Sequence, residues 1–131
     1  VVAPTEPDLI YHFMHPWTTE MSDYLAVGSD GVSVHDKFNG DKQMKIDRPT
    51  LWSAVYSETL GLGAVTRVLE APDGGWRTRY WDVPGRYRKH YFTTAMGAEY
   101  QAGDKAYYRI EVVPFAAGPV TWVAVARRLG G

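Results

Sequence analysis

Residues 105–113 read KAYYRIEVV, and they show the folding pattern of the chain most clearly. Apolar side chains occupy every second position from Ala106 to Val112, and more polar side chains lie between them. Successive side chains of a β-strand point to opposite faces, so this period of two predicts a strand with one face toward a core and one toward solvent. Residues 120–127 repeat the alternation and predict another strand.

Short runs of the same kind recur along the chain, and turn signals separate them. Asp30-Gly31, Asn39-Gly40 and Asp73-Gly74-Gly75 all tolerate the positive φ of tight turns. Such spacing is typical of an all-β sandwich or barrel in which hairpins are the local unit. The candidate strands, of which roughly nine are expected to be real, are residues 9–14, 23–27, 31–37, 43–48, 51–57, 64–71, 76–82, 86–94, 105–113 and 120–127.

Residues 50–71 allow two interpretations, because their apolar residues could also share one helical stripe. Gly61 and Gly63 lie in the middle of that stretch, and each would cost about 1 kcal/mol inside a helix. We therefore predict two strands that meet at Gly61-Leu62-Gly63.

Length and composition agree with one ordinary globular unit. The chain has 131 residues, of which 45% are apolar, 22% charged and 14% aromatic, so disorder, collagen and coiled coil are excluded. We find no internal repeat and no low-complexity linker. The sequence predicts an all-β fold for residues 1–131, a single-domain antiparallel β-sandwich with a small closed β-barrel as the alternative.

The net charge of -1 argues against a general affinity for nucleic acid, although bases next to aromatic rings keep single-stranded binding open as a minor alternative. The chain has no cysteine, which excludes disulfides and thiol chemistry, and it has no run of apolar residues long enough for a transmembrane segment. Its proline-rich start at Val1 would equally suit signal-peptide removal or a trimmed chain, and slightly favours secretion.

The most unusual segment is residues 76–92, which read WRTRYWDVPGRYRKHYF. Five bases and one acid lie among aromatic residues there, whereas residues 1–30 hold five acids and no Lys or Arg. A hairpin that turns at Val83-Pro84-Gly85 would alternate its two faces and set guanidinium groups beside flat rings. The predicted ligand-binding residues are Trp76, Arg77, Arg79, Tyr80, Trp81, Arg86, Tyr87, Arg88 and His90.

Guanidinium forks and stacking rings suit phosphate, carboxylate, sulfate or a sugar face. The leading hypothesis is a non-enzymatic binding module whose partner is a glycan, a lipid head group or a protein surface, and a homo-oligomer is also open. For the hairpin itself, a purely structural interpretation, in which arginines cover aromatic rings on the solvent face, is favoured over a binding site.

The alternative function is a small barrel that encloses an apolar ligand, as a carrier or as a cyclase or isomerase. The two functions differ in where the tryptophans point, either into an interior cavity or along one exposed rim. The four that decide this are Trp52, Trp76, Trp81 and Trp122.

No catalytic, cofactor or metal motif is complete in the sequence, so we predict no cofactor and no metal and leave enzymatic activity open. His12 and His15 are three residues apart, which suits a metal site on a helix, but on a strand they point to opposite faces. The last residues, from Arg127 to Gly131, are similar to the basic diglycine tail of ubiquitin-like proteins, and the match is confined to this tail.

The stretch from Tyr80 to Pro84 resembles a tyrosine-tryptophan-aspartate-x-proline motif of the aegerolysins, which are small β-sandwich proteins that bind membrane lipids. The resemblance covers only this short stretch and the preceding Asp73-Gly74. It implies a lipid-facing role for Trp76, Tyr80 and Trp81.

Overall fold

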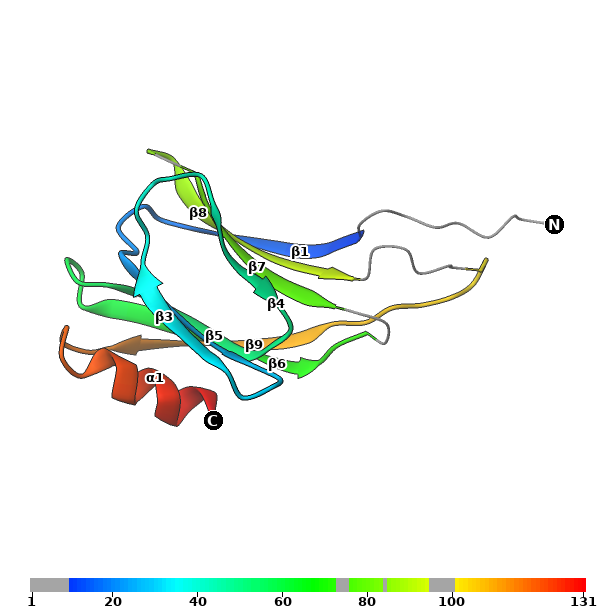
Figure 1. The fold of residues 1–131 in the computed structure, drawn as a ribbon. Coiled ribbons are helices and arrows are strands. Elements are labelled where there is room, and N and C mark those ends of the chain that lie inside the picture. Colours follow the sequence, from blue (N-terminus) through cyan, green and yellow to red (C-terminus); the bar gives the residue numbers. More distant parts are fainter. Residues whose placement is uncertain (1–9, 73–75, 84, 95–100) are drawn as a thin grey trace.

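The computed structural model describes residues 10–72, 76–83, 85–94 and 101–131, and it consists of two antiparallel β-sheets and one helix (Figure 1). One sheet has the strand order β1-β8-β7-β4, with β1 at Ile10–Trp17, β8 at Tyr87–Thr94, β7 at Arg77–Val83 and β4 at Met44–Arg48. The other has the order β3-β2-β5-β6-β9, with β3 at Ser33–Lys37, β2 at Asp23–Gly28, β5 at Thr50–Ser57, β6 at Leu62–Glu70 and β9 at Arg109–Ala116.

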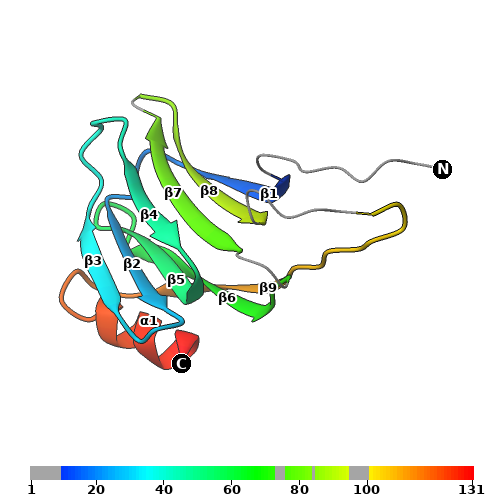
Figure 2. The same ribbon diagram turned by 45° about the vertical axis from the view of Figure 1, so that its right-hand side comes forward.

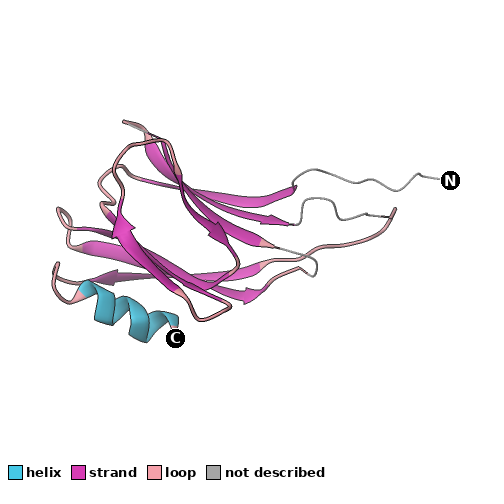
Figure 3. Ribbon diagram, in the orientation of Figure 1, coloured by secondary structure: helices cyan, strands magenta, loops and turns pink. Residues whose placement is uncertain are grey.

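The two sheets are separate layers, which confirms the predicted all-β sandwich. They are not closed into a barrel, so the alternative architecture is wrong. Figure 3 shows strands throughout both layers and the single helix at the carboxyl end of the chain. The prediction for residues 50–71 is also confirmed, because β5 and β6 form a hairpin in which Gly61 has a φ of 65°.

Nine of the ten candidate strands are present, with shifted ends. The tenth, residues 120–127, is wrong, because the chain forms helix α1 (Trp122–Gly130) there. Trp122, Ala126 and Gly130 are four residues apart and all three are buried, so the same residues that alternate also form a helical stripe. Arg127 and Arg128 lie in the last turn, where positive charge is favourable to the helix dipole.

The predicted turns have different outcomes. Asp30-Gly31 joins β2 to β3 in a hairpin, and Gly31 has a φ of 82°. Asn39-Gly40 connects β3 to β4 and therefore crosses between the sheets instead of closing a hairpin. Asp73-Gly74-Gly75 lies outside the described residues.

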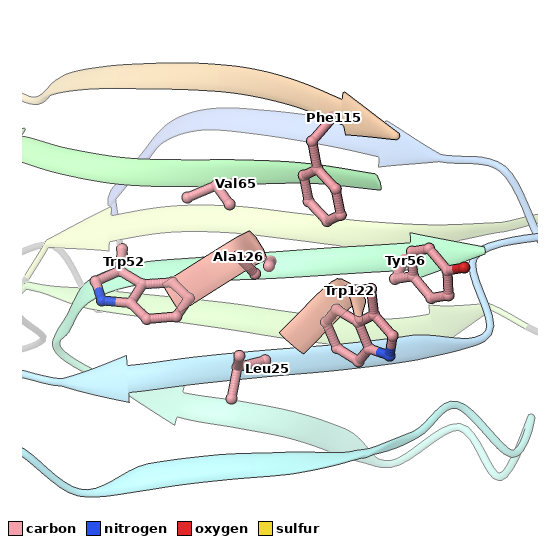
Figure 4. Packing of buried hydrophobic residues seen from close by; sticks show 8 residues of the cluster. Leu25, Trp52, Tyr56, Val65, Phe115, Trp122 and Ala126 are labelled. Atoms are coloured by element: carbon pink, nitrogen blue, oxygen red, sulfur yellow. The ribbon is translucent and has the colours of Figure 1, made fainter. Parts of the chain in front are cut away.

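Helix α1 covers the outer face of the five-stranded sheet, and the layer between them is one of two hydrophobic cores (Figure 4). Tyr56 stacks on Trp122 with ring centroids 5.0 Å apart and an interplanar angle of 5°, and it stacks on Phe115 at 6.3 Å. The Tyr56 hydroxyl donates a hydrogen bond to the carbonyl of Ala117 at 2.7 Å. Burial of these large rings anchors the helix on the sheet.

The second core lies between the two sheets. Tyr24 and Val55 from the five-stranded sheet meet Tyr80 and Ile46 from the four-stranded sheet. Polar contacts cross the same space: the Tyr80 hydroxyl bonds to Ser53 Oγ at 2.9 Å, and Thr50 and Thr78 hydroxyls bond at 2.7 Å. These buried hydrogen bonds fix the position of β7 over β5.

The two outer faces are not equivalent. Helix α1 covers the five-stranded sheet, whereas no described element covers the outer face of the four-stranded sheet (Figures 1 and 2). The outward side chains of β7 and β8 therefore meet solvent.

Candidate anion-binding site

Residues 76–92 form the β7–β8 hairpin as predicted, with Trp81 opposite Lys89 and Val83 opposite Tyr87. The exposure of β7 alternates along its whole length, and Thr78, Tyr80 and Asp82 are its buried positions. Because of this alternation the predicted binding residues do not share one surface. The outward set comprises Arg77, Arg79, Trp81 and Tyr87, and the inward set comprises Tyr80, Arg88 and His90.

The two remaining predicted residues lie at the ends of the hairpin. Arg86 is exposed next to the turn. Trp76 comes just before β7 and packs edge-on against Tyr108, with ring centroids 6.1 Å apart. Pro84, at the centre of the turn, lies outside the described residues.

The row of outward arginines is neutralised by one carboxylate. Asp47 on β4 accepts a hydrogen bond from Arg79 Nε at 2.8 Å and one from Arg77 at 3.3 Å. The Arg79 side chain is only 13% exposed. These two guanidinium groups therefore brace β7 against β4, which agrees with the structural interpretation for this part of the segment.

The inward residues belong to the interior. Tyr80 is fully buried, and burial raises the pKa of its hydroxyl well above the usual value. Arg88 pairs with the buried carboxylate of Asp82, and its guanidinium carbon lies 5.0 Å from the centre of the Phe38 ring. Asp82 Oδ2 also accepts a hydrogen bond from the Gly40 amide at 2.5 Å. Asp82 thus ties the β3–β4 connection to the hairpin.

A hollow of about 290 Å³ lies where the β7–β8 hairpin meets the β3–β4 connection. Trp81 and Tyr87 give it aromatic walls, and three cations surround it. Its lining residues are Lys42, Trp81, Asp82, Val83, Arg86, Tyr87 and Lys89. The Trp81 indole is held in place by a 2.7 Å hydrogen bond from its Nε1 to the carbonyl of Lys42.

Lys89 lies among three rings on the outer face. Its Nζ is 5.0 Å from the centre of the Trp81 ring, 5.4 Å from that of Tyr87 and 5.7 Å from that of Tyr91. Hydrogen bonding to the side chain of Tyr91, and then to that of Tyr87, raises the pKa of Lys89. The ammonium group is therefore charged throughout the physiological range and is held over the indole.

The cations of the hollow differ from most others in the protein. Among the described residues, no carboxylate forms an ion pair with Lys42, Arg86 or Lys89, whereas Arg77, Arg79 and Arg88 all have acidic partners. Asp82 lines the hollow, but its oxygens are engaged by Arg88 and Gly40. The hollow therefore carries an uncompensated positive charge.

Four residues that line this hollow were not among the predicted binding residues: Lys42, Asp82, Val83 and Lys89. Lys89 lies within the segment but was omitted from the predicted set, and Lys42 is distant in sequence. No local signal indicates Lys42, because the β3–β4 connection places it there through a left-handed backbone with a φ of 60°. The nearby turn signal at Asn39-Gly40 was recognised in the sequence, but the sequence does not show that this connection packs against the β7–β8 hairpin.

Trp52 and Trp122 pack between helix α1 and the five-stranded sheet and Trp81 faces outward, so the four tryptophans neither line one cavity nor form one exposed rim. His15 lies opposite His90 on the inner face, and the side chain of His12 is outside the described residues. Within the described parts of the chain, no three acidic or histidine side chains are grouped to hold a metal ion.

Comparison with protein-family models, with curated proteins and with solved structures finds no match to this chain. The aegerolysin resemblance thus receives no support from these comparisons, and the burial of Tyr80 removes one of its three lipid-facing candidates. Among the residues that the structure describes, no helix has the length and apolar character needed to cross a membrane.

Proposed function

We propose that the protein is a non-enzymatic binding module, and that the hollow between Trp81 and the side chains of Lys42, Arg86 and Lys89 binds an acidic glycan. The observation that carries this proposal is the combination of an immobilised indole with three cations that lack acidic partners. A flat ring offers apolar area to a sugar face, and the cations offer charge-assisted hydrogen bonds to a carboxylate or sulfate.

The small size of the hollow favours a single anionic sugar as the contacted unit. Ligand pockets typically measure about 300 to 1,000 Å³, and this hollow, at about 290 Å³, lies just below that range. The net charge of -1 for the whole chain disfavours a long polyanion, because the acidic remainder of the surface would repel it outside this site. A lipid head group shares the anionic chemistry and is a separate arm of the test.

We expect a sulfated disaccharide to change the tryptophan fluorescence and to bind more weakly as salt is raised from 50 to 500 mM, because the contact is electrostatic and exposed. The unsulfated disaccharide should bind at least about tenfold more weakly, since it offers no charge-assisted contact. Calorimetry gives the affinities, and vesicles of phosphatidylcholine with and without phosphatidylserine provide the lipid arm.

The double substitution Lys42→Ala and Arg86→Ala should weaken binding of the sulfated disaccharide by about tenfold or more, because two exposed charged contacts are lost. Its matched control is Lys105→Ala with Arg128→Ala, which removes the same two residue types from exposed positions on other elements. Equal weakening of disaccharide binding in both double variants would show that only the net charge matters and would contradict the proposed site. Binding to the vesicles without binding to the sulfated disaccharide would contradict an acidic glycan as the ligand.

A further inference from the structure

The inner face of the four-stranded sheet carries a column of aromatic and basic side chains at the pairing of β1 with β8. His15 lies directly opposite His90, Trp17 opposite Arg88, and Phe13 opposite Phe92. The His90 ring centroid is 4.2 Å from that of Tyr80 and 4.5 Å from that of Phe92. The His15 ring lies between Phe13 at 4.4 Å and Trp17 at 5.6 Å. Each imidazole is therefore flanked by rings on both sides.

This column contains buried polar atoms that have no hydrogen-bond partner. His90 is completely buried, and neither of its ring nitrogens is bonded. The other such atoms are His15 Nδ1, Trp17 Nε1, Arg88 Nε and Thr93 Oγ1. All belong to β1 or β8. Native proteins satisfy nearly all buried polar groups, so these unpaired side-chain atoms set the β1–β8 column apart from the rest of the described interior.

Among the described residues, the charged groups that face this column leave no anion for an added proton. From β7, Asp82 is engaged by Arg88 and Gly40, and the neutral Tyr80 hydroxyl bonds to Ser53. From β2, Tyr24 contacts Tyr80, and before β9 the Tyr108 hydroxyl donates to the carbonyl of Thr93. The facing positions of β6 include Ala64 and Thr66, which carry no charge. A proton on His90 would therefore add an uncompensated charge two residues from Arg88.

We propose that the cross-strand pair of His15 and His90 is an acid-sensitive lock: protonation of the pair separates edge strand β1 from β8 and opens the space between the sheets. Strand β1 is the element that moves because, among the described strands, it pairs with β8 alone. Strand β8 pairs with β1 and with β7, so it stays in the sheet when β1 leaves.

The direction of the pH dependence follows from the burial of the two rings. Burial lowers the pKa of His90 well below 6.5, the charge of His15 adds to this, and burial also lowers the pKa of His15. The open state binds these protons with ordinary affinity. The equilibrium constant that favours the closed state over the open state is therefore at its maximum above about pH 6.5. As the pH falls below this value, the constant decreases by up to about tenfold per pH unit for each proton taken up.

Hydrogen exchange on the full chain tests this lock. Amide protection factors, corrected for intrinsic exchange rates, are measured for β1 and for β5 at pH 7.5, 6.5, 5.5 and 4.5. We expect protection in β1 to fall at least tenfold between pH 6.5 and 5.5 while that in β5 stays constant. Simultaneous loss in both strands would show global acid unfolding, and constant protection in both would show that β1 stays closed; either result overturns the proposal.

Two variants connect the effect to His90. His90→Phe keeps the ring but cannot take up a proton at this position, so the loss of β1 protection between pH 6.5 and 5.5 should shrink to less than about tenfold, the part that His15 alone can contribute. If it does not fold, His90→Gln, which is also uncharged in this range, provides the same measurement. His35→Gln, at an exposed position of β3, is the matched control and should behave as the unmodified chain does. Retention of the whole acid effect in the His90 variant would assign it to other groups and overturn the proposal.

Discussion

Substitution of Gly130 by valine is expected to lower the free energy of unfolding by about 3 kcal/mol, because helix α1 would lose its close contact with the sheet. A Cβ atom at position 130 would lie 2.5 Å from Cε2 and 2.6 Å from Cε3 of Trp52, far inside van der Waals contact. Trp52 is itself buried and cannot move without disturbing Leu25 and Val65 around it. Urea unfolding measures the loss.

The neighbouring glycine is the control for this prediction. A Cβ at Gly131 would have as its nearest neighbour the carbonyl of Arg127 at 3.4 Å, so Gly131→Ala should change stability by less than about 0.5 kcal/mol. Trp52→Leu combined with Gly130→Ala should cost less than the sum of the single changes, since the smaller side chain makes room. Equal stabilities for the Gly130 and Gly131 variants would mean that the last turn does not pack on Trp52.

Asp82→Ala should be as damaging as the Gly130 change, or more so. The Asp82 carboxylate is completely buried and is the acidic partner of Arg88, whose side chain is 11% exposed. Its removal leaves a buried cation without a counter-charge, which costs about 3 to 5 kcal/mol. It also removes the acceptor of the Gly40 amide and loosens the connection that carries Lys42. Thermal unfolding measures stability, and disaccharide binding should weaken as well.

Asp47→Ala is the matched control, because it also removes a carboxylate that pairs with arginines. The Asp47 side chain is 39% exposed, so its pairs with Arg77 and Arg79 are screened and should contribute about 1 kcal/mol or less. Asp82→Leu with Arg88→Met should restore much of the stability, since a buried ion pair can be replaced by apolar side chains at little cost. A similar cost for both aspartates would contradict the interior role of Asp82.

The positions of the strands could be predicted because each strand has its own local alternation of apolar and polar residues. Period-two alternation and positive-φ glycines act over a few residues, so the Gly31 and Gly61 hairpins were accessible from the sequence. Residues 120–127 were wrongly predicted to form a strand, because their apolar residues fit both the period of two of a strand and the period of a helix. The choice between strand and helix depends on tertiary packing, because the helix stacks Trp122 on Tyr56 in the core that also contains Phe115.

The candidate site likewise combines features that the sequence predicts with features that it does not. The sequence located the hairpin and the alternation of its faces, but it could not decide which arginines were free. Asp47 neutralises Arg77 and Arg79 from β4, which is distant from β7 in sequence, and Asp82 neutralises Arg88 in the interior. Lys42 reaches the hollow through a connection between sheets, which no local pattern encodes.

By itself the sequence determined an all-β chain, its hairpins and the segment of concentrated arginines and rings, because these depend on short-range periodicity and composition. The tertiary structure alone decided which cations remain without a partner, that Tyr80 and His90 are interior residues, and that Gly130 closes against Trp52. The physical reason is that ion pairing and burial are set by residues on other strands, which sheet packing brings together and local sequence does not specify.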